Sequence, residues 1–229
     1  MFHYFRPESD DAPDSSIRRL SIPPETLDKQ VRELKAMEKE NQIRLVPMSA
    51  LDALTAGKCP TDEKPVLTVL TVDDAWSDAY DVGFKTFKKY GVPFSLSTIS
   101  RFTGSGGLRY QGFADRKEIA EMVKSGYGHV LSHSLDHKDF GYLSDSGSES
   151  EICDSRKDLE RQFGQKIDDF VFPAGHVDGY ADGWLKNCGY SRAFLTKPGK
   201  ITRKDLLSNP YSLPRLRVTS TTDMRNLIF

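Results

Sequence analysis

The chain has 229 residues, 38% of them hydrophobic and 28% charged, so it can bury a sizeable core without a disulfide or a structural metal. The formal net charge is −1 with acidic and basic residues interleaved, which excludes the basic surface typical of nucleic-acid-binding proteins. No apolar run approaches the roughly 20 residues of a membrane span, and the first residues lack the features of a secretory signal. We therefore expect a cytoplasmic protein.

The three cysteines, Cys59, Cys153 and Cys188, lie far apart and form no CxxC pair. An odd, scattered set is typical of reduced thiols rather than of a disulfide framework. We expect all three to be reduced and to serve only in packing or at the surface.

The N-terminal part predicts, in order, a short buried strand, a polar loop, an amphipathic helix, a short strand and a short helix. These occupy residues 1–5, 6–24, 24–40, 43–48 and 49–57. The long helix follows a Pro-Pro start, and four apolar residues recur in it at helical spacing. They are Leu27, Val31, Leu34 and Met37.

From residue 66 onward, apolar strands and amphipathic helices alternate at a regular spacing. The expected strands are residues 66–72, 92–99, 127–132, 168–173 and 190–196, and the expected helices are residues 78–91, 113–126, 149–164 and 180–189. Such alternation is typical of βα units in a parallel sheet or barrel, here with about seven strands. We expect one catalytic domain over residues 1–229, with the glycine-rich stretch 103–112 as a surface loop.

Polar clusters follow three of the predicted strands. Asp73 and Asp74 end the apolar run 66–72, His133 and His137 follow a second strand, and the sequence "FPAGH" ends a third. Because ligands of parallel α/β folds bind at the carboxyl ends of the strands, we expect the three clusters to meet at one mouth of the fold.

The histidine and aspartate pairs indicate a metal site when they are taken together. A four-residue interval puts His133 and His137 on one face of a helical turn, although HxxxH alone is a weak signal that surface histidines also give. An Asp-Asp pair alone equally fits a solvated turn or a helix cap. Two imidazoles and one carboxylate would leave a coordination position open for water, which is the pattern of a catalytic zinc site.

These motifs resemble those of the polysaccharide deacetylases of carbohydrate esterase family 4, the NodB-homology group. The family motif T-F-D-D is similar to Thr71–Asp74, H-[ST]-x-x-H is met by His133–His137, and F-x-Y-P-x-G is similar to Phe170–Gly175. Further similarities are "KKYGVPFSL", "GY" before "RAF" and "NPYSLPRLRV". The resemblance covers most of the chain.

The resemblance implies a distorted (β/α)₇ barrel that holds one divalent ion, usually zinc. It implies Asp74, His133 and His137 as metal ligands and Asp73 as the general base. The implied reaction is removal of N-acetyl groups from an amino sugar, in a poly- or oligosaccharide or in a lipid- or nucleotide-linked glycan precursor. The implied partner is therefore an N-acetylated saccharide.

The chain departs from the usual family pattern in several places. No histidine follows His176 to serve as the family's C-terminal general acid, but the opening "MFHYFRP" resembles the "MYHYVRP" of a circularly permuted branch. The resemblance therefore implies His3 as the general acid, and the alternative is a buried histidine in a short edge strand. Val72 replaces Phe, and Ala75-Trp76 replaces Gly. The Arg and Asp that orient the base in the family are not identifiable.

Candidate substrate-binding residues are Trp76, Pro173, Gly175 and His176. Trp76 packs against a sugar ring or fills the barrel mouth, and His176 lines the substrate groove or lies on its rim. Two other functions remain open, namely a metal amidohydrolase acting on a formamide or cyclic imide, and a glycan-binding module without turnover. The complete set of ligands and base argues against the second. The sugar, the linkage, the metal and the oligomeric state are not determined by the sequence.

Overall fold

A five-stranded parallel sheet in the order β3-β4-β5-β6-β7 forms the centre of the computed structural model, which describes residues 1–7, 15–57, 65–104, 112–177 and 179–229. Its strands are β3 (Thr71–Val72), β4 (Phe94–Thr98), β5 (Gly128–Ser132), β6 (Asp169–Val171) and β7 (Arg192–Phe194). A second, two-stranded parallel sheet pairs β1 (Ile43–Leu45) with β2 (Val66–Thr68).

Two extended segments, one at the N-terminus and one near the C-terminus, close the five-stranded sheet into a distorted barrel. Phe2 bridges Val72 of β3, and Leu213 bridges Phe194 of β7, both in parallel. The two segments meet through a backbone hydrogen bond of 3.0 Å from Val218 to the carbonyl of the first residue. The five strands and these two segments fill the seven strand positions of the expected (β/α)₇ barrel. The predicted strand at residues 1–5 is the N-terminal one of the two segments.

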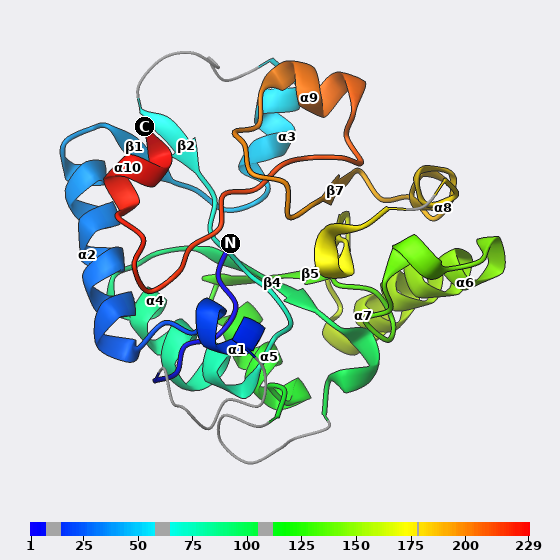
Figure 1. Ribbon diagram of the computed structural model, residues 1–229, viewed down its shortest axis with the longest axis horizontal. Helices are drawn as coiled ribbons and strands as arrows, with labels where there is room; N and C mark the ends of the chain where they lie inside the picture. Colours follow the sequence, from blue (N-terminus) through cyan, green and yellow to red (C-terminus); the bar gives the residue numbers. More distant parts are fainter. Residues whose placement is uncertain (8–14, 58–64, 105–111, 178) are drawn as a thin grey trace.

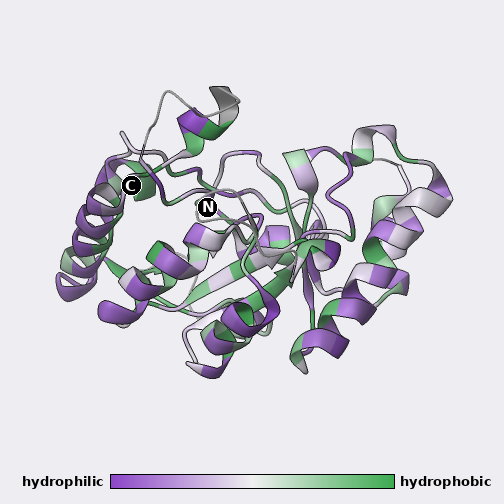
Figure 2. Cartoon of the chain, turned by 90° about the horizontal axis from the view of Figure 1, so that it is seen from below, coloured by the Kyte–Doolittle hydropathy of each residue, from purple (hydrophilic) through white to green (hydrophobic). Residues whose placement is uncertain are grey.

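Helices surround the sheet (Figure 1). The α-helices are α1 (Ser15–Leu20), α2 (Pro24–Lys39), α3 (Ala50–Thr55), α4 (Lys85–Lys89), α5 (Arg116–Lys124), α6 (Asp145–Glu149), α7 (Ser155–Phe163), α8 (Ala181–Asn187), α9 (Arg203–Ser208) and α10 (Met224–Ile228). In the described part of the chain, the π-helical segments η1 (Ala79–Phe84) and η4 (Ser150–Asp154) lead into α4 and α7. The 3₁₀ turns there are η2 (Ser100–Phe102), η3 (Phe140–Tyr142) and η5 (Pro173–Gly175). Hydrophobic residues are concentrated in the central strands and hydrophilic residues on the helices (Figure 2).

Helix α2 shows how the apolar spacing decides packing. It begins at Pro24, and its side chains Leu27, Val31, Leu34 and Met37 are all buried in the main core, as their helical spacing predicts. None of the described helices combines the length and the apolar character needed to cross a bilayer.

The apolar run 66–72 is not the single strand that we expected. It forms β2, whose residues are half-buried, and β3, whose residues are buried, and the two strands belong to different sheets. The reason is that β2 leaves the barrel to pair with β1, while β3 continues to the barrel mouth.

The expectation that all cysteines are reduced is wrong for two of them. Cys153 of η4 and Cys188 at the end of α8 form a disulfide with a Cα–Cα distance of 5.4 Å. Helix α8 packs against η4, so the fold brings together two thiols that are 35 residues apart. Cys59, like residues 105–111 of the predicted surface loop, lies outside the described residues.

Candidate active site

Asp73 and Asp74 follow β3 directly, and a sharp backbone turn gives them different partners. Asp74 and Ala75 have φ values of 70° and 58°, in the left-handed region that costs an L-residue about 1–2 kcal/mol. Two backbone hydrogen bonds hold this turn. The N–H of Ser77 donates to the carbonyl of Gly112 (2.7 Å), and the N–H of Ala114 donates to the carbonyl of Ala75 (2.8 Å). Strain of this kind is concentrated at functional sites.

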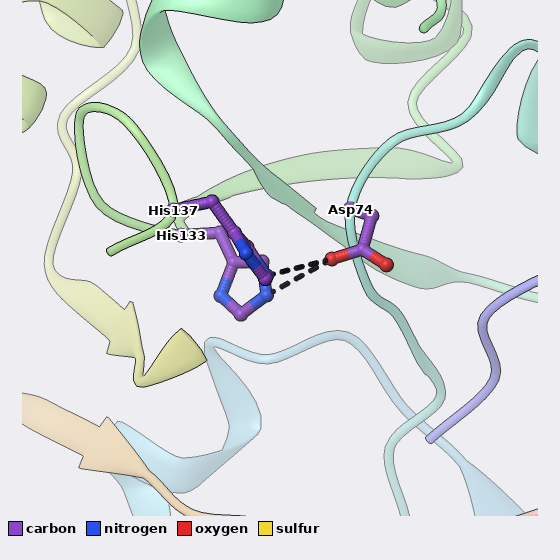
Figure 3. Close-up of side chains that lie close together, drawn as sticks. All are labelled: Asp74, His133 and His137. Atoms are coloured by element: carbon purple, nitrogen blue, oxygen red, sulfur yellow. Dashed lines mark ion pairs between the residues drawn. The ribbon is translucent and has the colours of Figure 1, made fainter. Parts of the chain in front are cut away.

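Asp74 faces both predicted histidine ligands (Figure 3). Its Oδ1 lies 3.2 Å from Nε2 of His133 and 3.3 Å from Nε2 of His137. All three atoms lie within 4.8 Å of one another. Ligand atoms about 2.0–2.1 Å from a tetrahedral zinc ion are about 3.3 Å apart, so the observed spacing suits one such ion.

The two histidines come together through an irregular turn after β5, and not through a helical turn as we expected. Ser134 and His137 both have positive φ values, 65° and 60°. The Oγ of Ser134 accepts the backbone N–H of His137 at 2.9 Å and so closes the turn. Both rings therefore face Asp74 as the four-residue spacing predicted, but the backbone between them is an irregular turn and not a helical one.

A buried glutamate holds the backbone of the loop between His133 and His137. Glu151, on the π-helical segment η4, is 1% exposed, and its Oε2 accepts the backbone N–H groups of Leu135 (3.0 Å) and Asp136 (2.9 Å). Its Oε1 lies 3.0 Å from Nζ of Lys138. The sequence analysis missed Glu151, because the two amides that it accepts are 16 and 15 residues away in the chain.

The hydrogen bonding of His133 leaves the correct nitrogen free for a cation. Its Nδ1 lies 2.7 Å from the carbonyl oxygen of Val171, which can only accept, so Nδ1 carries the proton and Nε2 presents its lone pair towards Asp74. The triad therefore has the donor set of a metal site.

Asp73 is held by an arginine that the sequence analysis did not identify. Both Asp73 oxygens accept hydrogen bonds from Arg215, at 2.7 and 2.8 Å, and Ser97 donates to Oδ1 at 2.8 Å. Burial would raise the pKa of Asp73, but the Arg215 guanidinium outweighs it and keeps the carboxyl ionised. Arg215 lies within "NPYSLPRLRV", one of the stretches that resemble the family. The resemblance therefore included this arginine but did not show that its partner is Asp73.

His3 lies beside Asp73 because the N-terminal segment occupies a strand position of the barrel next to β3. Its Nε2 is 3.9 Å from Asp73 Oδ2, and its side chain is 12% exposed. Its Nδ1 is buried and has no hydrogen-bond partner among the described residues. Burial lowers the pKa of His3, so the ring is neutral near pH 7. The role of His3 as a general acid stays a prediction.

Comparison with known proteins decides the family. The sequence profile described as polysaccharide deacetylase matches residues 60–193, which is more than half of the chain. The chain belongs to the polysaccharide deacetylase family.

Three similar proteins extend this result. YxkH of Bacillus subtilis (strain 168), whose name places it among polysaccharide deacetylases, is 29% identical over 76% of this chain and 58% of its own length. The poly-β-1,6-N-acetyl-D-glucosamine N-deacetylase of Staphylococcus aureus (strain MRSA252) is 23% identical over 66% of this chain and 53% of its own length. The chain thus spans little more than half the length of these curated relatives. The Streptococcus pyogenes deacetylase PplD, solved in complex with acetate, shares the fold, with a TM-score of 0.83, 23% identity, and coverage of 100% of this chain and 94% of that one.

The polysaccharide deacetylase match contains only part of the candidate site. Asp73, Asp74, His133 and His137 lie inside residues 60–193, whereas His3 and Arg215 lie outside them. The two outer residues reach Asp73 because the closing segments of the barrel carry them there. The closure of the barrel therefore adds two residues from outside the matched region to the environment of Asp73.

Trp76, one of the predicted substrate-binding residues, lies against the triad. Its indole Nε1 donates to Oδ2 of Asp74 at 3.1 Å, and its ring stacks on Phe113 with a centroid distance of 4.3 Å. Contact with a sugar ring stays a prediction.

The other three predicted substrate-binding residues follow β6. Pro173 and Gly175 belong to η5, and Gly175 has a φ of 80° and packs closely against Thr196. His176 is 62% exposed and its Nδ1 lies 2.8 Å from the carboxylate of Asp139. The structure places these residues at the carboxyl end of the strand next to β5, and their binding of substrate stays a prediction.

Proposed function

We propose that the chain is a metal-dependent hydrolase that removes N-acetyl groups from the amino sugars of a poly- or oligosaccharide or of a glycan precursor. The observation that carries this proposal is the convergence of Asp74, His133 and His137 beside a separate, ionised carboxylate, Asp73. The family, and the N-deacetylase name of one relative, support the substrate class. A divalent cation such as zinc held by the triad would supply Lewis-acid chemistry, acidifying water and polarising the amide carbonyl.

The residues of the chain would divide the proton transfers between them. Asp73, kept ionised by Arg215, would accept the proton of the attacking water. Nε2 of His3, which lies 3.9 Å from Oδ2 of Asp73, would then accept this proton from Asp73 and donate it to the departing amine. The bond between the acetyl carbon and nitrogen then breaks, which releases acetate and the free amino sugar.

We also propose that residues 1–229 form one catalytic domain. The first residues and the segment near Leu213 both belong to the same barrel, and α10 packs against α2. The compartment stays a prediction, and the Cys153–Cys188 disulfide is of a kind more common outside the cytoplasm.

Acetate release from N-acetylglucosamine oligomers, measured with and without a chelator, tests the proposal. We expect activity that the chelator abolishes and that added Zn²⁺ restores. Chelator-resistant activity would contradict the role of the metal. If formamides and cyclic imides are tested in parallel, hydrolysis of these but not of the acetylated oligomers would assign another amide substrate.

Two substitutions test the proton transfers. Asp73→Asn and His3→Gln should each lower kcat by about 10²–10⁴-fold and leave bound Zn²⁺ unchanged. Full turnover by His3→Gln would remove His3 from the mechanism, and full turnover by Asp73→Asn would remove the proposed base.

A further inference from the structure

The side chain of Trp76 makes a directed contact with a proposed metal ligand. Asp74 divides its two oxygens between two sets of partners, because Oδ1 faces the histidines and Oδ2 accepts the indole N–H of Trp76 at 3.1 Å. An indole nitrogen can only donate, so this contact fixes which oxygen remains for a cation. Substrate binding by the ring would not require this hydrogen bond.

The surroundings of Trp76 hold its indole in this orientation. Phe113 stacks on the ring at a centroid distance of 4.3 Å and an interplanar angle of 20°, and Tyr4 packs against it at 5.5 Å. The guanidinium of Arg6 lies 5.5 Å from the ring centroid. The backbones of Trp76 and Phe113 also form an antiparallel bridge. The donor is therefore fixed by packing on the ring and by pairing of its backbone.

We propose that Trp76 is a positioning residue that orients Asp74 for the cation, an inference that rests on the proposed function. The terminal torsion of an aspartate is broad and roughly two-fold, so an untethered carboxylate rotates between orientations. The Trp76 indole removes that freedom on a residue whose backbone is already in the left-handed region. Loss of such an outer partner typically lowers metal affinity by about 10–100-fold.

The chain provides a matched control for the test. Its other tryptophan, Trp184, also donates its indole N–H to an aspartate, Asp145, at 2.7 Å, but on α8. We would measure the Kd for Zn²⁺ by competition with a chromophoric chelator in wild type, Trp76→Phe and Trp184→Phe. Phenylalanine keeps an aromatic ring for stacking and removes the donor.

We expect Trp76→Phe to bind Zn²⁺ about 10–100-fold more weakly than wild type, and Trp184→Phe to bind it as wild type does. Equal affinity in Trp76→Phe and wild type would overturn the positioning role while leaving the proposed function intact. A wild type that binds no Zn²⁺ would instead contradict the proposed function, and the inference with it.

A second measurement does not depend on the folding of Trp76→Phe. In the Trp184→Phe protein, Trp76 is the only tryptophan, so a ¹⁵N-labelled sample gives one indole N–H resonance. We expect Zn²⁺ to shift this resonance, because the cation withdraws charge from the carboxylate that accepts the hydrogen bond. An unmoved resonance in the Zn²⁺-saturated protein would overturn the inference.

Discussion

Replacing Glu151 with alanine should loosen the loop that carries both histidine ligands. The carboxylate of Glu151 is 1% exposed and accepts two backbone N–H groups, at 3.0 and 2.9 Å, from residues between His133 and His137. Alanine leaves both amides without their acceptor. The turn then loses its support on the side of η4.

The expected cost follows from these contacts. A hydrogen bond to a charged group contributes about 1.5–3 kcal/mol, and the pair with the half-exposed Lys138 adds less than about 1 kcal/mol. Because one of the two amides lies near the surface, we expect a loss of about 3–4 kcal/mol. For a chain of this size that lowers Tm by about 6–16 °C. Loss of loop definition should also weaken Zn²⁺ binding by at least about 10-fold.

Thermal unfolding and Zn²⁺ titration of Glu151→Ala would measure both effects, with Glu38→Ala as the control. Glu38 accepts the amide of Leu45 at 2.9 Å and pairs with Lys35, but it lies on α2. We expect Glu38→Ala to lose stability and to keep its affinity for Zn²⁺. Glu151→Ala with wild-type affinity, or equal weakening in both variants, would refute the reasoning.

Three further substitutions test other parts of the fold. Arg215→Gln should cost about 3–5 kcal/mol in urea unfolding, because it leaves the buried Asp73 carboxylate without its bidentate partner; a loss under 1 kcal/mol would argue against that pair. Burial raises the pKa of Asp78 from 3.8 to about 6, in spite of a guanidinium partner 2.6 Å away. The folded state therefore binds this proton more tightly than the unfolded state, and as pH rises from about 4 to 7 wild type should lose up to about 3 kcal/mol relative to Asp78→Asn; parallel pH profiles of the two proteins would contradict it. Gly175→Ala should cost about 2–4 kcal/mol in the same assay, since φ is 80° and a Cβ would lie 2.8 Å from the backbone nitrogen of Thr196; unchanged stability would show that the loop gives way.

The sequence by itself determined the alternation of strands and helices and the edge at which the chemistry lies. Asp73 and Asp74 end an apolar run, and His133 follows another, because a buried parallel strand has a local signature and its polar end marks the mouth of the fold. The interval between His133 and His137 also predicted that both would face one partner, although the turn between them is not helical.

Only the tertiary structure decided which distant residues complete the site. Arg215 is 142 residues from Asp73, and His3 reaches the same carboxylate only because the N-terminal segment closes the barrel. The division of residues 66–72 between two sheets and the Cys153–Cys188 bond have the same origin. Local periodicity states which face of an element is buried, but pairing between elements is set by the closure of the whole barrel, which no short stretch of sequence encodes.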